Sequence, residues 1–131
     1  MPISKKIVLL EDDRSSSRLI ASFLEKSGYT VWESSEGRNA IELSLKEKPD
    51  LLIADIMLPD MNGSEAVKQL MSAPTLEDFK VLFLTSLLGK VAKPGEETKL
   101  KVDGKEFPAL AKPINPDALI AIVDRITGGN N

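Results

Sequence analysis

Four apolar runs of the chain each end in polar side chains that could do chemistry together. These side chains are a run of three acids, a further carboxylate, a hydroxyl and an ammonium: Glu11, Asp12, Asp13, Asp55, Thr85 and Lys112. Carboxylate oxygens are ligands that hard divalent cations such as Mg²⁺ prefer. If these side chains lie together, they form a cation site that also carries a hydroxyl and an ammonium.

Each of these features has a common structural explanation when it stands alone. An acid run is often solvated or caps a helix, and Asp55 could simply cap the turn that Pro59, Asn62 and Gly63 predict. A Thr at the end of a strand and a Lys before a Pro are also common. Their joint occurrence at successive strand ends is much harder to explain by chance, and it favours a functional site.

The elements that must position these residues are short apolar runs alternating with amphipathic segments. We predict strands at residues 7–10, 29–33, 51–55, 79–84 and 107–111. Helices are expected after a cap at Asp13 or Ser15, from Gly37, after Gly63, and from Asn115-Pro116. This order predicts an α/β fold with a doubly wound, five-stranded parallel sheet, whose strand carboxyl ends meet at one edge.

The helical stripes and one irregular segment complete the predicted elements. Leu19 and Leu45 are expected on the buried stripes of the first two helices. Residues 87–107 break the alternation, because Asp103-Gly104 between alternating side chains is a strong hairpin signal. We predict a short β-hairpin around residues 98–107 that replaces or shortens the fourth helix, although residues 96–100 could hold one helical turn.

Size and composition exclude several classes of protein. A length of 131 residues suits one domain, 1–131, and a net charge of −3 without a basic block argues against direct nucleic-acid binding. Because the chain has no Cys and no His, thiolate or His-ligated zinc and His-based catalysis are excluded. No apolar segment approaches membrane-spanning length, so we expect a soluble cytoplasmic protein without membrane insertion.

Four motifs in order resemble the receiver domain of the two-component response regulators. They are Leu9–Asp13, Asp55–Gly63, Leu84–Ser86 and Ala111–Pro113, and the resemblance covers about residues 5–127. It implies a flavodoxin-like receiver fold and a part in a phosphorelay. The chain ends shortly after the last predicted helix, so we expect a stand-alone receiver that signals through contacts with an unknown downstream protein.

The resemblance assigns a role to each site residue. Asp55 would be the phosphoacceptor, taking a phosphoryl group from a sensor histidine kinase or histidine phosphotransfer protein, with Thr85 and Lys112 binding phosphate oxygens. The Mg²⁺ ligands would be Asp12, Asp55, the Met57 backbone carbonyl and, through water, Glu11. The chemistry is reasonable, because a carboxylate nucleophile needs no activating base and the cation offsets repulsion between anions. Self-catalysed transfer and autodephosphorylation are implied, rather than conventional enzyme turnover.

The sequence leaves two details of the resemblance open. The acid pair is either Glu11/Asp12 or Asp12/Asp13, and we prefer Glu11/Asp12 because it directly follows the apolar run. Receivers often carry an aromatic residue three positions before the Lys, where this chain has Ala109, and Phe107 would share its face of the strand. We therefore predict that movement of Thr85 is read by residues 87–107.

Three other functions are alternatives to this interpretation. A receiver-like binding module that is never phosphorylated is the main alternative, favoured by Ala109 and the altered fourth helix. A phosphatase or hydrolase on a similar sheet would need a proton donor where Met57 stands. A flavin or dinucleotide binder would need a Gly-rich loop after the first strand, which is absent.

Overall fold

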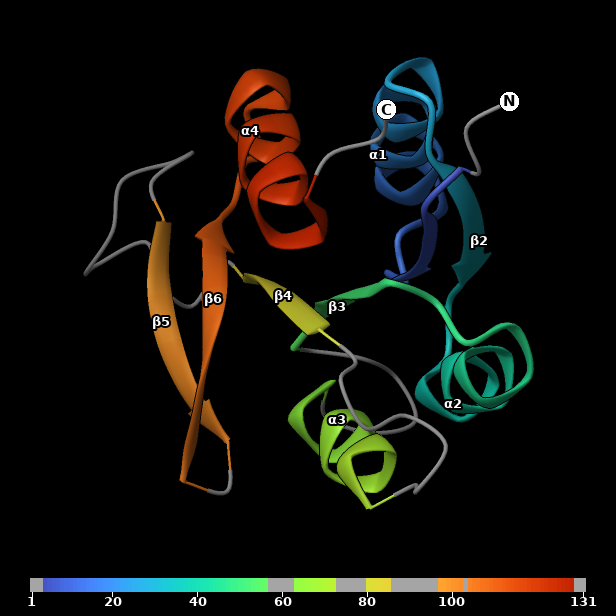
Figure 1. Cartoon of the computed structure of the whole chain (residues 1–131), viewed down its shortest axis with the longest axis vertical. Coiled ribbons are helices and arrows are strands. Elements are labelled where there is room, and N and C mark those ends of the chain that lie inside the picture. Colours follow the sequence, from blue (N-terminus) through green and yellow to red (C-terminus); the bar gives the residue numbers. More distant parts are fainter. Residues whose placement is uncertain (1–3, 57–62, 73–79, 86–96, 103, 129–131) are drawn as a thin grey trace.

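The computed structural model describes residues 4–56, 63–72, 80–85, 97–102 and 104–128. Within them one six-stranded sheet has the order β2-β1-β3-β4-β6-β5 (Figure 1). The strands are β1 (Lys6–Leu10), β2 (Thr30–Ser34), β3 (Leu51–Asp55), β4 (Lys80–Thr85), β5 (Glu97–Val102) and β6 (Lys105–Ala111). The helices are α1 (Arg14–Lys26), α2 (Gly37–Glu47), α3 (Gly63–Met71) and α4 (Pro116–Thr127).

The sheet confirms the predicted parallel strands and the predicted hairpin. β2, β1, β3, β4 and β6 are parallel, and β5 is antiparallel to β6. Gly104 in the turn has a φ of 82°, a left-handed conformation that glycine adopts without strain. A helical turn at residues 96–100 is wrong for Glu97–Leu100, which is extended in β5. The rest of the irregular segment, 87–96, lies outside the described residues.

The helices cover the two faces of the sheet in pairs. α1 and α4 lie on one face, and α2 and α3 lie on the other (Figure 1). Alternate residues of a strand face opposite sides, so Ile53 packs in the α1/α4 layer and Leu52 in the α2/α3 layer. All five residues of β3 are buried, as its continuous apolar run predicts for a central parallel strand.

The helix caps are those predicted from the sequence, but two residues expected on the buried faces of helices are exposed. Asp13 caps α1 by accepting a hydrogen bond from Ser16 N, and Asn115 caps α4 in the same way from Ala118 N, both at 3.1 Å. Leu19 and Leu45 were predicted to be buried, yet they are 56% and 41% exposed. In α1 the buried face is centred on Ser17, Ile20, Ala21 and Leu24, which turns Leu19 toward solvent.

Candidate functional site

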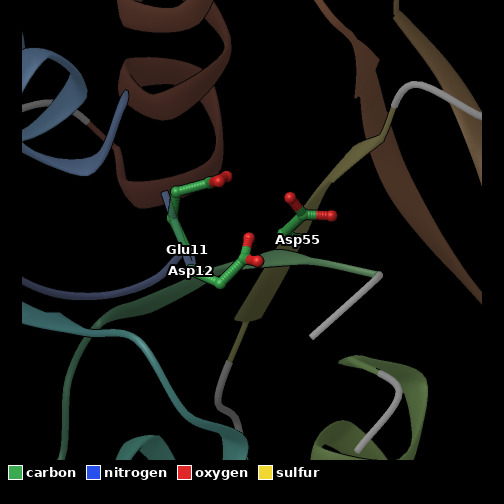
Figure 2. Close-up of side chains that lie close together, drawn as sticks. All are labelled: Glu11, Asp12 and Asp55. Atoms are coloured by element: carbon green, nitrogen blue, oxygen red, sulfur yellow. The ribbon is translucent and has the colours of Figure 1, made fainter. Parts of the chain in front are cut away.

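The carboxyl ends of four parallel strands bring the predicted site residues to one edge of the sheet. Asp55 ends β3 and Thr85 ends β4, while Glu11 follows β1 and Lys112 follows β6. Figure 2 shows the carboxyl groups of Glu11, Asp12 and Asp55 turned toward a common space. Residues far apart in the chain therefore meet because parallel strands end at the same edge.

The three carboxylates are close enough to share a cation. One oxygen from each of Glu11, Asp12 and Asp55 lies within 4.8 Å of the others. Glu11 and Asp55 are buried, whereas Asp12 is exposed. An all-oxygen set that is open to water on one side fits Mg²⁺, which keeps several waters and takes only a few protein carboxylates. It does not fit zinc, which favours thiolate and imidazole ligands.

Lys112 supplies a positive charge to this acidic cluster. Its Nζ atom lies 2.8 Å from Glu11 Oε2 and 2.6 Å from Asp55 Oδ2. Burial alone would lower the pKa of Lys112, but hydrogen bonds to Asp55 and Glu11 and their negative charges raise it overall. Lys112 therefore remains an ammonium that is shared between two carboxylates.

Glu11 is the most deeply buried acid of the cluster, with 2% of its surface exposed. Burial and the nearby charge of Asp55 raise the pKa of Glu11, and the hydrogen bond from Lys112 only partly opposes them. Its other oxygen, Oε1, accepts a hydrogen bond of 3.2 Å from Asp13 N. Glu11 is thus held in a fixed orientation beside Asp55 by one cation and one amide.

The two possible acid pairs are placed differently by the fold. Asp12 and Glu11 both belong to the carboxylate cluster with Asp55. Asp13 instead turns its side chain to the start of α1, where it accepts from Ser16 N. This arrangement leaves Glu11 and Asp12 as the acids that can act together with Asp55.

Thr85 ends the strand next to the one that Asp55 ends. Met57, the other predicted site residue, falls outside the described residues. Thr85 is 1% exposed, and its backbone oxygen accepts a hydrogen bond of 3.1 Å from Lys112 N. This bond ties the end of β4 to the residue that carries the ammonium. The peptide bond between Lys112 and Pro113 is cis.

Gly63 is a positioning residue that the sequence suggested only as the start of a helix. A Cβ atom at this position would lie 2.2 Å from the backbone oxygen of Asp55. Gly63 N also donates a hydrogen bond of 2.7 Å to Ile56 O. Only glycine permits α3 to begin this close to the end of β3, so Gly63 helps to fix the backbone of Asp55. The Asn-Gly pair that follows Asp55 was the available signal.

A polar pocket that the sequence did not predict opens beside Glu11. It has a volume of about 580 Å³ and is lined by residues of α1, β2 and α2, among them Arg14, Glu33 and Asn39. Glu33 accepts a hydrogen bond of 2.8 Å from Ser17 Oγ and forms an ion pair with Arg18 at 2.7 Å. Among the described residues, no helix is long and apolar enough to cross a membrane.

Comparisons with known proteins agree with this geometry. A family model described as the response regulator receiver domain matches residues 7–124. The chain is 35% identical over 127 residues to the alkaline phosphatase synthesis transcriptional regulatory protein PhoP of Bacillus subtilis, covering 95% of the chain and 49% of PhoP. It is 28% identical over 124 residues to the polar-differentiation response regulator DivK of Brucella anthropi, covering 95% of the chain and 97% of DivK. The chain thus spans about half the length of PhoP and nearly all of DivK.

Solved structures show the same fold. A CheY-like receiver domain from Methylobacillus flagellatus has a TM-score of 0.79 at 22% identity, with 95% of this chain and 99% of that chain covered. The chemotaxis protein CheY4 of Vibrio cholerae has a TM-score of 0.77 at 25% identity, with 95% and 99% covered. The expected flavodoxin-like receiver architecture is therefore confirmed, with β5 as an additional strand.

Proposed function

Because the chain belongs to the response regulator receiver domain family, we propose that Asp55 accepts a phosphoryl group and forms an aspartyl phosphate. The observation that carries this proposal is the ammonium of Lys112, which lies 2.6 Å from Asp55 Oδ2 beside the acids Glu11 and Asp12. A buried carboxylate next to a fixed cation and a candidate metal site is suited to phosphoryl transfer, which depends on positioning and charge neutralisation.

One residue of the site acts as the nucleophile, and the others stabilise negative charge. An oxygen of Asp55 attacks phosphorus, and the bond from phosphorus to the donor imidazole nitrogen breaks with its electron pair remaining on that nitrogen. Thr85 donates its hydroxyl hydrogen bond to one phosphate oxygen, and Lys112 moves from the Asp55 carboxylate to another. Glu11, Asp12, Asp55 and the Met57 carbonyl would hold Mg²⁺, which when bound supplies positive charge between the anions.

The donor and the output follow from the same proposal. A sensor histidine kinase or a histidine phosphotransfer protein supplies the phosphoryl group, and attack of water on the aspartyl phosphate later releases it. The signal passes to a downstream protein through surface contacts. A single receiver domain over residues 1–131 and a cytoplasmic location, where a kinase of this type would meet it, are parts of this proposal.

Intact-mass analysis after incubation with acetyl phosphate and Mg²⁺ tests the phosphoacceptor. We expect one labile phosphate on the wild-type chain, none on Asp55→Asn, and none when the metal is chelated beforehand. A phosphate that persists on Asp55→Asn would show that another residue is the acceptor.

A second candidate function is a receiver-like binding module that is never phosphorylated. Ala109, in place of the usual aromatic residue, and the β5–β6 hairpin are the observations that favour it. The same measurement separates the two functions. Measurable Mg²⁺ binding with no phosphate from acetyl phosphate or from a kinase would support the module.

A further inference from the structure

β5 is an edge strand, added outside the parallel strands of the sheet. It pairs with β6 over six positions, from Glu97–Leu110 to Val102–Lys105. On its other side no strand of the described residues follows (Figure 1). An edge strand presents main-chain N–H and C=O groups that a further strand can use.

The orientation of β6 determines which groups of β5 face outward. Lys112 N donates a hydrogen bond to Thr85 O of β4. The main-chain groups of successive residues in a strand point to opposite sides, so the even-numbered residues of β6 turn toward β4 and its odd-numbered residues turn toward β5. The residues of β5 that lie opposite these odd-numbered residues exchange hydrogen bonds with them. They are Thr98, Leu100 and Val102.

The other three residues of β5 turn their main-chain groups away from β6. They are Glu97, Lys99 and Lys101, which lie opposite even-numbered residues of β6. Each residue has one N–H and one C=O, so these three residues present a row of six groups. Pro108 lies opposite Lys99, at a position where β5 needs no N–H from β6. The outer edge of β5 is therefore a regular template for an added strand.

The side chains along this edge are mainly positive. Glu97 points to the α4 side of the sheet, where Arg125 NH1 lies 2.8 Å from its Oε1. Lys99 and Lys101 share that face because alternate residues of a strand point the same way, and both are exposed. Glu106 lies opposite Lys101 on β6. Three cations thus accompany two acids on this face, in a chain whose net charge is −3.

A second copy of the chain is a poor partner for this edge. Two antiparallel copies of β5 satisfy every outward group only when the pairing is centred on Lys99, which then lies opposite Lys99 of the other copy. Like charges directly opposite each other are destabilising. Glu97 would lie opposite Lys101 of the other copy, but Glu97 is already paired with Arg125. The lysines therefore keep copies apart, as lysines on edge strands do, and favour a strand of opposite charge.

We propose that the outer edge of β5 binds an extended acidic segment of another protein, which adds a strand antiparallel to β5, the more stable orientation. Carboxylates at alternate positions of that segment lie opposite Lys99 and Lys101. The residue between them lies on the other face beside Leu100, which packs half-buried against the core, so an apolar side chain fits there. Main-chain hydrogen bonds supply affinity, and the alternating side chains supply selectivity. This surface does not include Asp55 and goes beyond the function proposed for it.

Amide exchange measured by NMR tests the pairing. The unphosphorylated full chain is titrated with a short capped peptide of alternating Glu and Val. In the free protein the amides of Thr98, Leu100 and Val102 should be protected, while the three outward amides of β5 should exchange freely. The peptide should then protect the outward amides, which contact through side chains alone would not do.

Two methylated peptides separate hydrogen bonding from charge. In an antiparallel pair the Glu residues opposite Lys99 and Lys101 turn their N–H groups toward β5. N-methylation of the Glu residues should therefore weaken binding by ~10-fold, the effect of losing two hydrogen bonds. N-methylation of the Val residues, whose N–H groups point away from β5, should leave binding intact.

A double substitution tests the charges. Lys99→Gln with Lys101→Gln keeps the outward main-chain groups and should weaken peptide binding by ~5-fold, the effect of two cross-strand charge pairs. Lys26→Gln with Lys46→Gln is the matched control, because both lysines are exposed and lie in α1 and α2. This control should bind the peptide as the wild type does.

Several outcomes would overturn the proposed docking edge. They are no binding of the Glu–Val peptide, binding without protection of the outward amides, equal binding by the Glu-methylated peptide, and self-association through β5. Each of these outcomes leaves the proposed phosphorylation of Asp55 unaffected, because none of the samples is phosphorylated.

Discussion

Lys112 Nζ donates a hydrogen bond of 2.6 Å to Asp55 Oδ2, although β4 lies between β3, which Asp55 ends, and β6, which Lys112 follows. The same ammonium bonds Glu11 Oε2 at 2.8 Å. Positive charge is therefore already in position for the phosphoryl group that Asp55 is proposed to accept. Such preorganisation lowers the cost of building up negative charge during transfer.

Removing this charge should separate metal binding from phosphorylation. We expect Lys112→Ala to slow phosphorylation by acetyl phosphate by ~10²-fold, the usual effect of losing one preorganised donor. Mg²⁺ affinity should rise, because the ammonium no longer competes for Asp55 and Glu11. Calorimetry for Mg²⁺ and intact mass for phosphate measure the two effects, with Lys46→Ala as an exposed lysine control. Phosphorylation at the wild-type rate would show that Lys112 has no part in transfer.

Substitution of the neighbouring acids tests which two belong to the site. Asp13→Ala should cost about 1 kcal/mol of folding free energy through loss of the α1 cap, and phosphorylation should persist. Asn115→Ala removes the equivalent cap of α4 and serves as its control. Asp12→Asn should weaken Mg²⁺ binding while the protein keeps its stability. Loss of metal binding in Asp13→Ala as well as in Asp12→Asn would favour the pair Asp12/Asp13.

Gly63→Ala tests whether the start of α3 fixes Asp55. The new Cβ would meet the Asp55 backbone oxygen at 2.2 Å, so the backbone must shift, at a cost of roughly 1–3 kcal/mol. Phosphorylation should slow as Asp55 moves away from Lys112. Gly128→Ala is a useful comparison, because its φ of 83° makes alanine strained but nothing lies within 4 Å of the added atom. That variant should lose stability and keep its phosphorylation rate.

Tyr29 should ionise well above the usual range. Its hydroxyl donates to Asp124 and lies 3.2 Å from Thr127 Oγ1. Burial first, and then the hydrogen bond to Asp124, raises the pKa of Tyr29 to about 12. Because this pKa is raised from 10.0 in the folded state, the contribution to stability is fully present below pH 10 and is lost as pH approaches 12.

The chain has a single tyrosine, so its ultraviolet absorbance titration reports Tyr29 alone. A midpoint near pH 10 in the folded protein would contradict this environment. Tyr29→Phe should abolish the titration and remove the extra loss of stability at high pH.

The location of the site at the strand ends could be predicted because the topology of a parallel sheet determines it. Once Asp55 and Thr85 end neighbouring parallel strands, they must lie at the same edge whatever the details of packing. Asp103-Gly104 predicted the hairpin because turn chemistry acts over a few residues. Sequence alone could not predict that Lys112 is shared between Glu11 and Asp55, or that Glu97 pairs with Arg125. These contacts depend on side-chain positions set by the whole fold, as does the rotation of α1 that buries Ser17 and exposes Leu19.

The sharing of Lys112 has a consequence for the order in which the chain folds. Glu11 and Asp55 are brought together by the first and third strands, but the cation that neutralises them lies 101 and 57 residues further along. Until β6 docks, the nascent site contains repelling acids without their counter-charge. Contacts of such long sequence separation form late in folding. Competence to take up phosphate should therefore appear only in molecules that have completed the sheet, so a labile phosphate on Asp55 would also report that folding is finished.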